Sequence, residues 1–331
     1  MHLKSNTVLA SAEFIASKSR DVILSESGVR IAAQEILKEM VKQDYSTAQW
    51  KEHPLNPKSE NVDTLDWIFL VDLLNFSFWT DVGPPFSVLT YTGYWSLCAV
   101  VNRALDEGFP ISKAVTMRNL TRVQFDHIFR SDSTAQVPLA DLRYDAIVSA
   151  GHTLQEKWEG SFVNCVKAAN NSALKLMEIL VEDFPSFRDW CEFEGQTVVF
   201  LKRAQIMVAD IWAAFSSKGL GEFSDIGIVT MFADYRVPQA LVAMGALEYS
   251  QTLLSRLRKG DLMPVGDVHE VEIRGCSIWA VEQIRREIAS LSDNNRKVNA
   301  ILIDFYLWDF AKAHPKQLSP IPTHRTRSMF Y

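Results

Sequence analysis

Residues 231–245, MFADYRVPQALVAMG, place an acid, a phenol and a guanidinium directly before a proline and an apolar run. The apolar residues recur at i, i+3, i+4 and i+7 from Val237, which is one face of an α-helix. Pro238 suits the first turn of that helix, because its missing N–H has no intrahelical partner there. Asp234 therefore precedes a helix N-terminus, whose partial positive charge favours an ionised carboxylate. Such an acid is either a structural group at the helix end or a group held ionised for chemistry.

Helical periodicity continues outward from this stretch through most of the chain. Apolar residues recur three or four positions apart, with charged residues between them, in four further long segments. These segments are residues 28–41, 162–184, 201–215 and 277–291. Strand signals are short: residues 196–200 (QTVVF) are rich in β-branched side chains, and residues 269–275 (HEVEIRG) alternate apolar with charged ones. The sequence predicts a mostly α-helical fold with a small β element.

The predicted organisation is a single domain over residues 1–331, with residues 1–30 left open as a loosely ordered N-terminal segment. Proline and glycine clusters at 53–57, 83–85 and 219–221 indicate loops rather than linkers, and a division near residue 135 is the alternative. No segment reaches the ~20 apolar residues of a membrane span, and the N-terminus lacks a signal-peptide pattern. We therefore expect a soluble protein of the cytoplasm, with the nucleus as a second compartment.

Composition and missing motifs narrow the classes of function. Hydrophobic residues make up 47% of the chain and charged residues 22%, and the net charge of −6 argues against a general nucleic-acid binder. The four cysteines lie far apart, without a metal-binding spacing, and indicate free thiols. The sequence has no GxGxxG after a strand, no GxxxxGKS/T, no HExxH and no GxSxG. We expect a helical protein without a metal or an organic cofactor.

Two apolar segments carry polar groups that need an explanation. In AILIDFYLWDFAK (300–312), Asp304 lies among apolar and aromatic residues, and burying its carboxylate is costly unless it is paired, protonated or used. Trp308 lies one turn further on the same face. In VDLLNFSFWTD (71–81), aromatic residues surround Asn75. Both features fit either ordinary core packing or a pocket in which aromatic rings hold a flat heterocycle and polar groups bind its edge.

Cationic side chains occur at the start of two predicted helices. Lys202 and Arg203 begin the 201–215 segment, where basic residues oppose the helix dipole. They are either a solvated surface pair or part of an anion site that also uses helix N–H groups. Arg236 adds a further cation beside Asp234. Together, these residues favour binding or hydrolysis of a small, flat ligand that is phosphorylated or glycosidic.

Long, chemically unusual stretches resemble one known family. The chain is similar to the queuosine salvage proteins, the queuosine 5′-phosphate N-glycosylases, over about residues 30–331. The resemblance implies hydrolysis of queuosine 5′-monophosphate to queuine and ribose 5-phosphate, without a cofactor, a stable nucleic-acid complex or a membrane. Queuine would then be reinserted into tRNA by a separate enzyme. The matching stretches are LNFSFW, YTGYWSLCAVVNRALDEG, FLKRAQIMVADIW, FADYRVPQ, VEIRGCSIWAVE, DFYLWDFA and HRTRSMFY.

A weaker resemblance concerns the helical fold and the acid at its centre. DYRVPQALVAMGAL is similar to the segment of helix-hairpin-helix DNA glycosylases in which an aspartate at a helix start is the catalytic acid, and Asp234 corresponds to that aspartate. The preceding residues 218–231 lack the glycine-rich hairpin of those enzymes, which counts against binding of duplex DNA. By this resemblance, Asp234 would stabilise the oxocarbenium-like charge at C1′ and accept a proton from the attacking water.

The remaining expected site residues bind substrate. We expect Phe76, Trp79 and Tyr235 to stack on the base, Asn75 and Asp304 to bind its polar edges or its cationic arm, and Lys202, Arg203 and Arg236 to bind the 5′-phosphate, with Trp308 as a further substrate-binding residue. Three alternatives stay open. They are a queuine-type carrier without hydrolysis, a base-excision glycosylase acting on DNA or RNA, and a purely structural helical scaffold.

Overall fold

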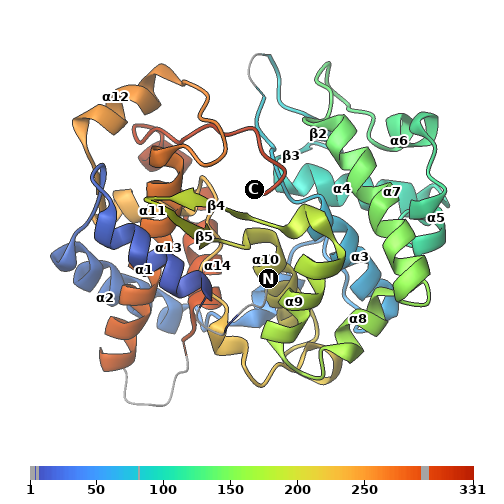
Figure 1. Cartoon of the computed structure of the whole chain (residues 1–331), viewed down its shortest axis with the longest axis horizontal. Helices are drawn as coiled ribbons and strands as arrows, with labels where there is room; N and C mark the ends of the chain where they lie inside the picture. Colours follow the sequence, from blue (N-terminus) through green and yellow to red (C-terminus); the bar gives the residue numbers. More distant parts are fainter. Residues whose placement is uncertain (1–3, 5–6, 81–82, 292–297) are drawn as a thin grey trace.

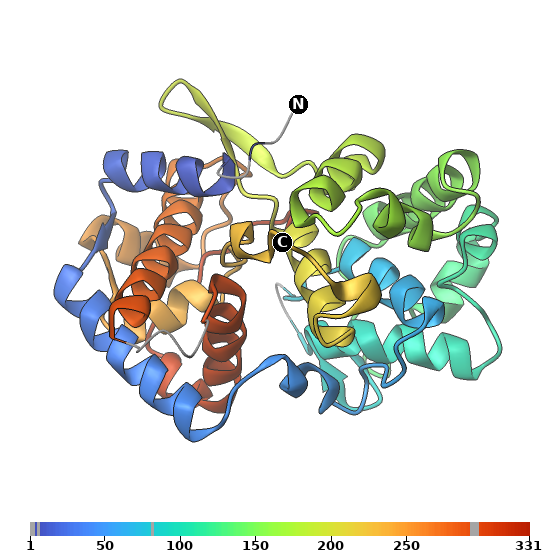
Figure 2. The same cartoon turned by 90° about the horizontal axis from the view of Figure 1, so that it is seen from below.

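The computed structural model describes residue 4 and residues 7–80, 83–291 and 298–331. Helices dominate this part of the chain, and its strands form three two-stranded antiparallel ribbons, so the predicted mostly α fold with small β elements is confirmed. Figures 1 and 2 show two groups of helices side by side. One buried apolar cluster extends through both groups. The predicted likeness to helix-hairpin-helix DNA glycosylases stays a prediction.

The first group packs around the long helix α13 (Val268–Leu291), at the left of Figure 1. The other helices of this group come from both ends of the sequence, because the chain leaves the group after α2 and returns before α11. They are α1 (Thr7–Lys18), α2 (Glu26–Lys42), α11 (Val237–Ala243), α12 (Gln251–Lys259), α14 (Ala300–Ala313) and α15 (Pro315–Leu318).

The second group packs around α3 (Val62–Leu73) and α10 (Lys202–Ala214). Almost every residue of α3 is buried, including the charged residues Asp66 and Asp72. The other helices of this group are α4 (Tyr94–Asp106), α5 (Ala114–Arg118), α6 (Arg122–Ile128), α7 (Ala140–Lys157), α8 (Phe162–Ala168) and α9 (Ala173–Asp183). Short 3₁₀ turns connect the elements: η1 (Thr47–Lys51), η2 (Pro185–Phe187), η3 (Gly219–Gly221) and η4 (Ile226–Ile228).

The three ribbons are short and lie apart from one another. They pair β1 (Val22–Leu24) with β6 (Leu247–Tyr249), β2 (Ser87–Val88) with β3 (Tyr91–Thr92), and β4 (Trp190–Phe193) with β5 (Gln196–Val199). The strand predicted from QTVVF is β5. Within the described residues, no helix is long and apolar enough to cross a membrane.

The predicted strand over residues 269–275 is wrong, because these residues form the first turns of α13. Their alternation of apolar and charged side chains is typical of a strand with one solvated face, but here both kinds are buried. Glu270 and Arg274 are fully buried and paired with each other at 3.2 Å, one helical turn apart. Charged residues that are paired inside the core therefore produced a misleading pattern.

The other predicted helices agree with the structure, with one division. Residues 28–41, 201–215 and 277–291 lie largely within α2, α10 and α13. The segment 162–184 is split into α8 and α9, because Asn170 and Asn171 adopt left-handed conformations with φ of 49° and 59°. Asparagine tolerates this conformation better than most residues, so the pair ends one helix and leads into the next.

The N-terminal region and residue 135 were the two open points of the predicted domain organisation. Residues 7–30 form α1, β1 and the start of α2, and Val8 and Ile15 of α1 are buried against the core. On either side of residue 135, α5 and α7 pack directly on each other. The single domain over residues 1–331 stays a prediction.

Gly151→Ala is expected to lower the free energy of unfolding by about 1–3 kcal/mol or more, because an added Cβ would lie 2.2 Å from the backbone nitrogen of Arg118. Neither backbone can yield as a flexible side chain would, so α5 and α7 must move apart. Urea denaturation followed by circular dichroism measures the loss. Gly227→Ala is the control, because its Cβ would have no neighbour within 4 Å among the described residues. Equal midpoints for the two variants would contradict the close packing of α5 and α7.

Candidate active site

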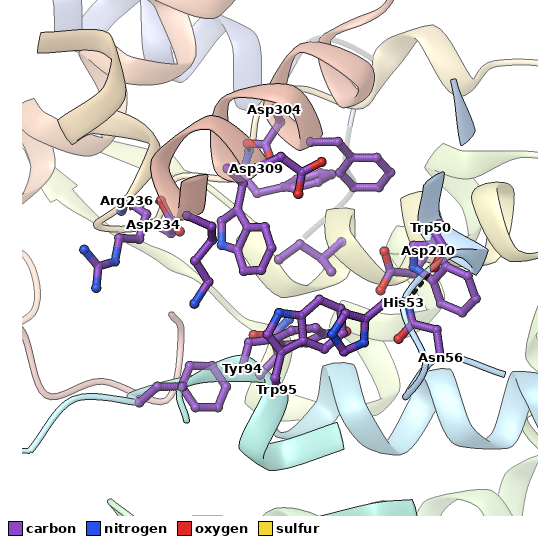
Figure 3. A pocket seen from close by; sticks show the side chains of 18 of the residues that line it. Trp50, His53, Asn56, Tyr94, Trp95, Asp210, Asp234, Arg236, Asp304 and Asp309 are labelled. Atoms are coloured by element: carbon purple, nitrogen blue, oxygen red, sulfur yellow. Dashed lines mark hydrogen bonds between the residues drawn. The ribbon is translucent and has the colours of Figure 1, made fainter. Parts of the chain in front are cut away.

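A cavity of about 790 Å³ lies between the two groups of helices and takes its walls from both. Such a volume falls in the range of pockets for small ligands and cofactors. The walls come from η1 and the residues around it, from residues 75–80, from the start of α4, from α10, from residues 232–236 and from α14. Figure 3 shows acidic side chains on several sides of this cavity, with aromatic rings on the side nearest α4.

Asp234 lies on the cavity wall, directly before α11 as the sequence predicted. Its Oδ1 accepts the backbone N–H groups of Arg236 and Val237, each at 2.8 Å. These two bonds and the cation of Lys202 favour the ionised form, but burial outweighs them and raises the pKa of Asp234 above its ordinary value. The carboxylate is therefore held in place by the helix start and is more basic than an exposed aspartate.

A second acid faces the same space from α14. Asn299 caps this helix by accepting the N–H of Leu302 at 3.0 Å, and its inner face presents Asp304 to the cavity. Asp304 accepts the backbone N–H of Phe232 at 2.9 Å, which ties α14 to the strand-like segment that leads into Asp234. Burial, reinforced by the nearby charge of Asp234, raises the pKa of Asp304 well above its usual range. The neutral form of this acid is therefore favoured.

Lys202 supplies the cation between these acids. It begins α10, is buried, and reaches the carbonyl of Asn75 at 3.5 Å. Burial lowers the pKa of Lys202 to about 8, although the charge of Asp234 opposes this shift. Two turns along the same helix, burial raises the pKa of Asp210 to about 7, and the Trp50 side chain hydrogen-bonds its carboxylate. The helix α10 thus presents a lysine and an acid that both titrate near neutral pH.

Aromatic rings form much of the remaining wall. Trp95 stacks on His53 with ring centroids 3.3 Å apart and planes within 9° of parallel. Trp308 packs edge to face against Trp95 at 5.9 Å and against Tyr94 at 6.3 Å. Beyond this cluster, Asp309 of α14 accepts a 2.5 Å hydrogen bond from Tyr45. The cavity therefore combines flat apolar surfaces with acids at its edge, as Figure 3 shows.

Eight of the ten residues expected from the sequence line this cavity. They are Asn75, Trp79, Lys202, Asp234, Tyr235, Arg236, Asp304 and Trp308. The guanidinium carbon of Arg327 lies 3.6 Å from the ring centre of Trp79, and this guanidinium also donates a hydrogen bond to the Trp79 carbonyl at 2.7 Å. Arg236 is exposed, at the rim of the cavity.

The expected binding roles of Phe76 and Arg203 are not supported, because neither residue lines the cavity. Phe76 is fully buried, with the guanidinium carbons of Arg143 and Arg203 at 4.3 and 5.1 Å from its ring centre. Arg203 donates to the carbonyls of Leu73 and Ser186. Arginine at the carboxyl end of α3 satisfies carbonyls that have no partner within the helix, which explains a buried cation here without a ligand.

Several lining residues were missed, although one signal could have found some of them. Lys202, Ile206 and Asp210 lie at i, i+4 and i+8 along α10, and Trp308 and Lys312 follow Asp304 at the same spacing along α14. On each of these two helices, an acid and a lysine lie on the face that lines the cavity. No such pattern marks the other missed residues, which include Tyr45, Trp50, His53, Asn56 and Asp309.

Comparison with known proteins shows the family of the chain. The sequence profile of the family described as queuosine salvage protein matches residues 55–331. The chain belongs to the queuosine salvage protein family. Its relatives in this family include proteins named queuosine 5′-phosphate N-glycosylase/hydrolase. One from Mus musculus is 46% identical over 97% of both chains, and one from Schizosaccharomyces pombe is 41% identical over 98% of this chain and 99% of its own. A bacterial relative of the same name, from Sphaerobacter thermophilus, is 39% identical over 80% of this chain and 81% of its own.

The stretches by which the sequence resembles the queuosine salvage family converge in space. LNFSFW, FADYRVPQ and DFYLWDFA lie far apart in the sequence, yet each contributes residues to the cavity wall. Within the described ranges, no group of three His, Cys, Asp or Glu side chains is arranged to hold a metal ion.

Proposed function

We propose that the protein hydrolyses the N-glycosidic bond of queuosine 5′-monophosphate, giving queuine and ribose 5-phosphate. The observation that carries this proposal is the placement of Asp234 beside Lys202 on the wall of a nucleotide-sized cavity. The names of the relatives support the same substrate. We infer a single domain over residues 1–331 that uses neither a metal nor an organic cofactor.

Asp234 would act on the sugar. As the bond between C1′ and the base breaks, the electron pair leaves with the base and positive charge develops on the ribose. A carboxylate beside C1′ stabilises that charge and accepts one proton from the water whose oxygen bonds to C1′. The departing base gains one proton, so that one water is consumed in the net reaction. Lys202 favours the ionised form of Asp234, because its cation opposes the effect of burial on the pKa of Asp234.

The base would occupy the aromatic part of the cavity. Trp79 and Tyr235, which are expected to stack on the base, both line the cavity, and Trp308, Tyr94 and Trp95 add further aromatic surface. Queuine carries a cationic aminomethyl cyclopentenediol arm. Asp304, with Asn75, would bind the polar edges of the base or this arm.

The 5′-phosphate would lie toward the exposed rim, where Arg236 and Lys312 face the cavity. Arg236→Gln is expected to raise KM for the monophosphate about tenfold, the low end for a hydrogen bond to a charged group, because the site is exposed. The effect should shrink as salt increases. Steady-state kinetics at several salt concentrations measures it. Arg258→Gln makes the same charge change on α12, away from the cavity, and an equal rise in KM there would contradict the assignment.

Release of free base under multiple turnover separates the enzyme from a carrier with the same cavity. The purified protein is mixed with excess queuosine 5′-monophosphate, and queuine and ribose 5-phosphate are followed by mass spectrometry. More product than protein supports hydrolysis. Tight binding without product would identify a carrier, and product only from queuosine-containing RNA would identify a polymer-directed glycosylase.

A further inference from the structure

A buried arginine outside the cavity contacts the segment that carries Asp234. Arg274 belongs to α13, is only 1% exposed and does not line the cavity. Its Nε donates to the carbonyl of Ala233, the residue before Asp234, at 3.2 Å. The ring centres of Phe200 and Tyr331 lie 4.0 and 4.3 Å from its guanidinium carbon. The backbone leading into Asp234 is therefore attached to a side chain that packing holds in one place.

The same guanidinium reaches the start of α10. Its two terminal nitrogens donate to both carboxylate oxygens of Asp189, at 3.0 and 2.6 Å. Asp189 in turn accepts the backbone N–H of Lys202 at 3.0 Å, and its own carbonyl accepts the N–H of Phe200 at 3.0 Å. One cation thus sets the backbone positions of Asp234 and Lys202. It bonds directly to the residue before Asp234 and is connected to Lys202 through Asp189.

A third part of the cavity wall joins this cluster. Glu270 accepts a hydrogen bond from Arg274 at 3.2 Å and another from the hydroxyl of Tyr331 at 3.0 Å. Tyr331 lines the cavity, and its carbonyl accepts the N–H of Ser77 at 3.1 Å. Residues 75–80 are therefore connected to the same buried cation.

We propose that Arg274 is a positioning residue that fixes Asp234 and Lys202 relative to each other without touching the substrate. This inference rests on the proposed function, since it assigns the effect to that reaction. The planar fork of arginine meets Asp189 with two bonds while still reaching Glu270 and the Ala233 carbonyl. The compact ammonium of lysine keeps the charge but cannot make this set of contacts. A displacement of about 1 Å at a catalytic group costs roughly 10²-fold in rate.

Arg274→Lys is the test. We expect kcat to fall by roughly 10²-fold with KM nearly unchanged, because the groups are present but displaced. Hydrogen exchange, measured without substrate, should accelerate in peptides covering residues 198–204 and 229–237 and stay unchanged in α5 and α7. Arg256→Lys is the matched control: Arg256 also pairs with one carboxylate through two bonds, both 2.7 Å to Asp267, but lies outside the cavity wall.

A second variant guards against a folding defect. Tyr331→Phe keeps the ring against Arg274 and removes only the hydroxyl donor to Glu270, and we expect a smaller fall in kcat with the same local exchange. Unchanged kcat in folded R274K, or faster exchange spread evenly over the chain, would overturn the proposal. The exchange measurement is independent of turnover, so wild-type protein that releases no queuine would refute the proposed function and not the connection through Arg274.

Discussion

Asp234→Asn is expected to lower kcat by about 10³-fold or more, because the carboxylate both stabilises charge at C1′ and accepts a proton from water. The amide retains an oxygen that can accept the N–H groups of Arg236 and Val237, so the start of α11 should be unchanged. Substrate affinity should stay close to that of the wild type. Burial raises the pKa of Asp234, so replacing it by a neutral group should not weaken the fold. Queuine release and substrate titration by tryptophan fluorescence measure the two effects separately.

Asp225→Asn provides a matched control for this variant. Asp225 accepts the backbone N–H groups of Ala173 and Leu174 at the start of α9, at 2.6 and 3.2 Å, so it has the same structural role at a helix end. It does not line the cavity. If D234N and D225N both kept kcat near the wild-type value, Asp234 would be a structural group at the helix start and the proposed mechanism would be wrong.

The fold was predictable where a helical segment buries only one of its faces. The amphipathic segment 28–41 became α2, because its apolar face needed a core. The prediction failed at residues 269–275, where Glu270 and Arg274 are buried as an ion pair. Alternation of apolar and charged residues indicates a strand only if the charged positions face water. The sequence alone does not say which charged residues are paired inside the protein.

The site was predictable from residues whose chemistry does not suit their surroundings. Asp304 in an apolar helix and Asp234 before Pro238 are both unusual in sequence, and both line the cavity. Phe76 and Arg203 shared the same neighbourhood in sequence but point into packing between helices. His53 carries no local signal, because its stacking on a ring of α4 depends on how the chain folds back. The direction in which a side chain points depends on the tertiary structure. A residue that is close in sequence to a site residue therefore need not point into the site.

Lys202→Met should lower kcat/KM by about 10²-fold near pH 7, since it removes a charge that favours the ionised form of Asp234. The two limbs of the pH profile give the sharper test. In the wild type, activity requires ionised Asp234 and charged Lys202, so it should fall at high pH as Lys202 loses its proton near its pKa of about 8. In K202M this basic limb should disappear. The acidic limb should move to higher pH, because loss of the cation raises the pKa of Asp234 further.

Lys113→Met separates this effect from a general loss of charge. Lys113 also contacts two aspartates, Asp63 at 2.5 Å and Asp66 at 2.8 Å, but lies away from the cavity. Its replacement should leave both limbs of the profile in place. If K202M kept a basic limb near pH 8, that limb would belong to another group and Lys202 would have no part in keeping Asp234 ionised. A shift of the acidic limb to lower pH would contradict the sign of the Lys202–Asp234 interaction itself.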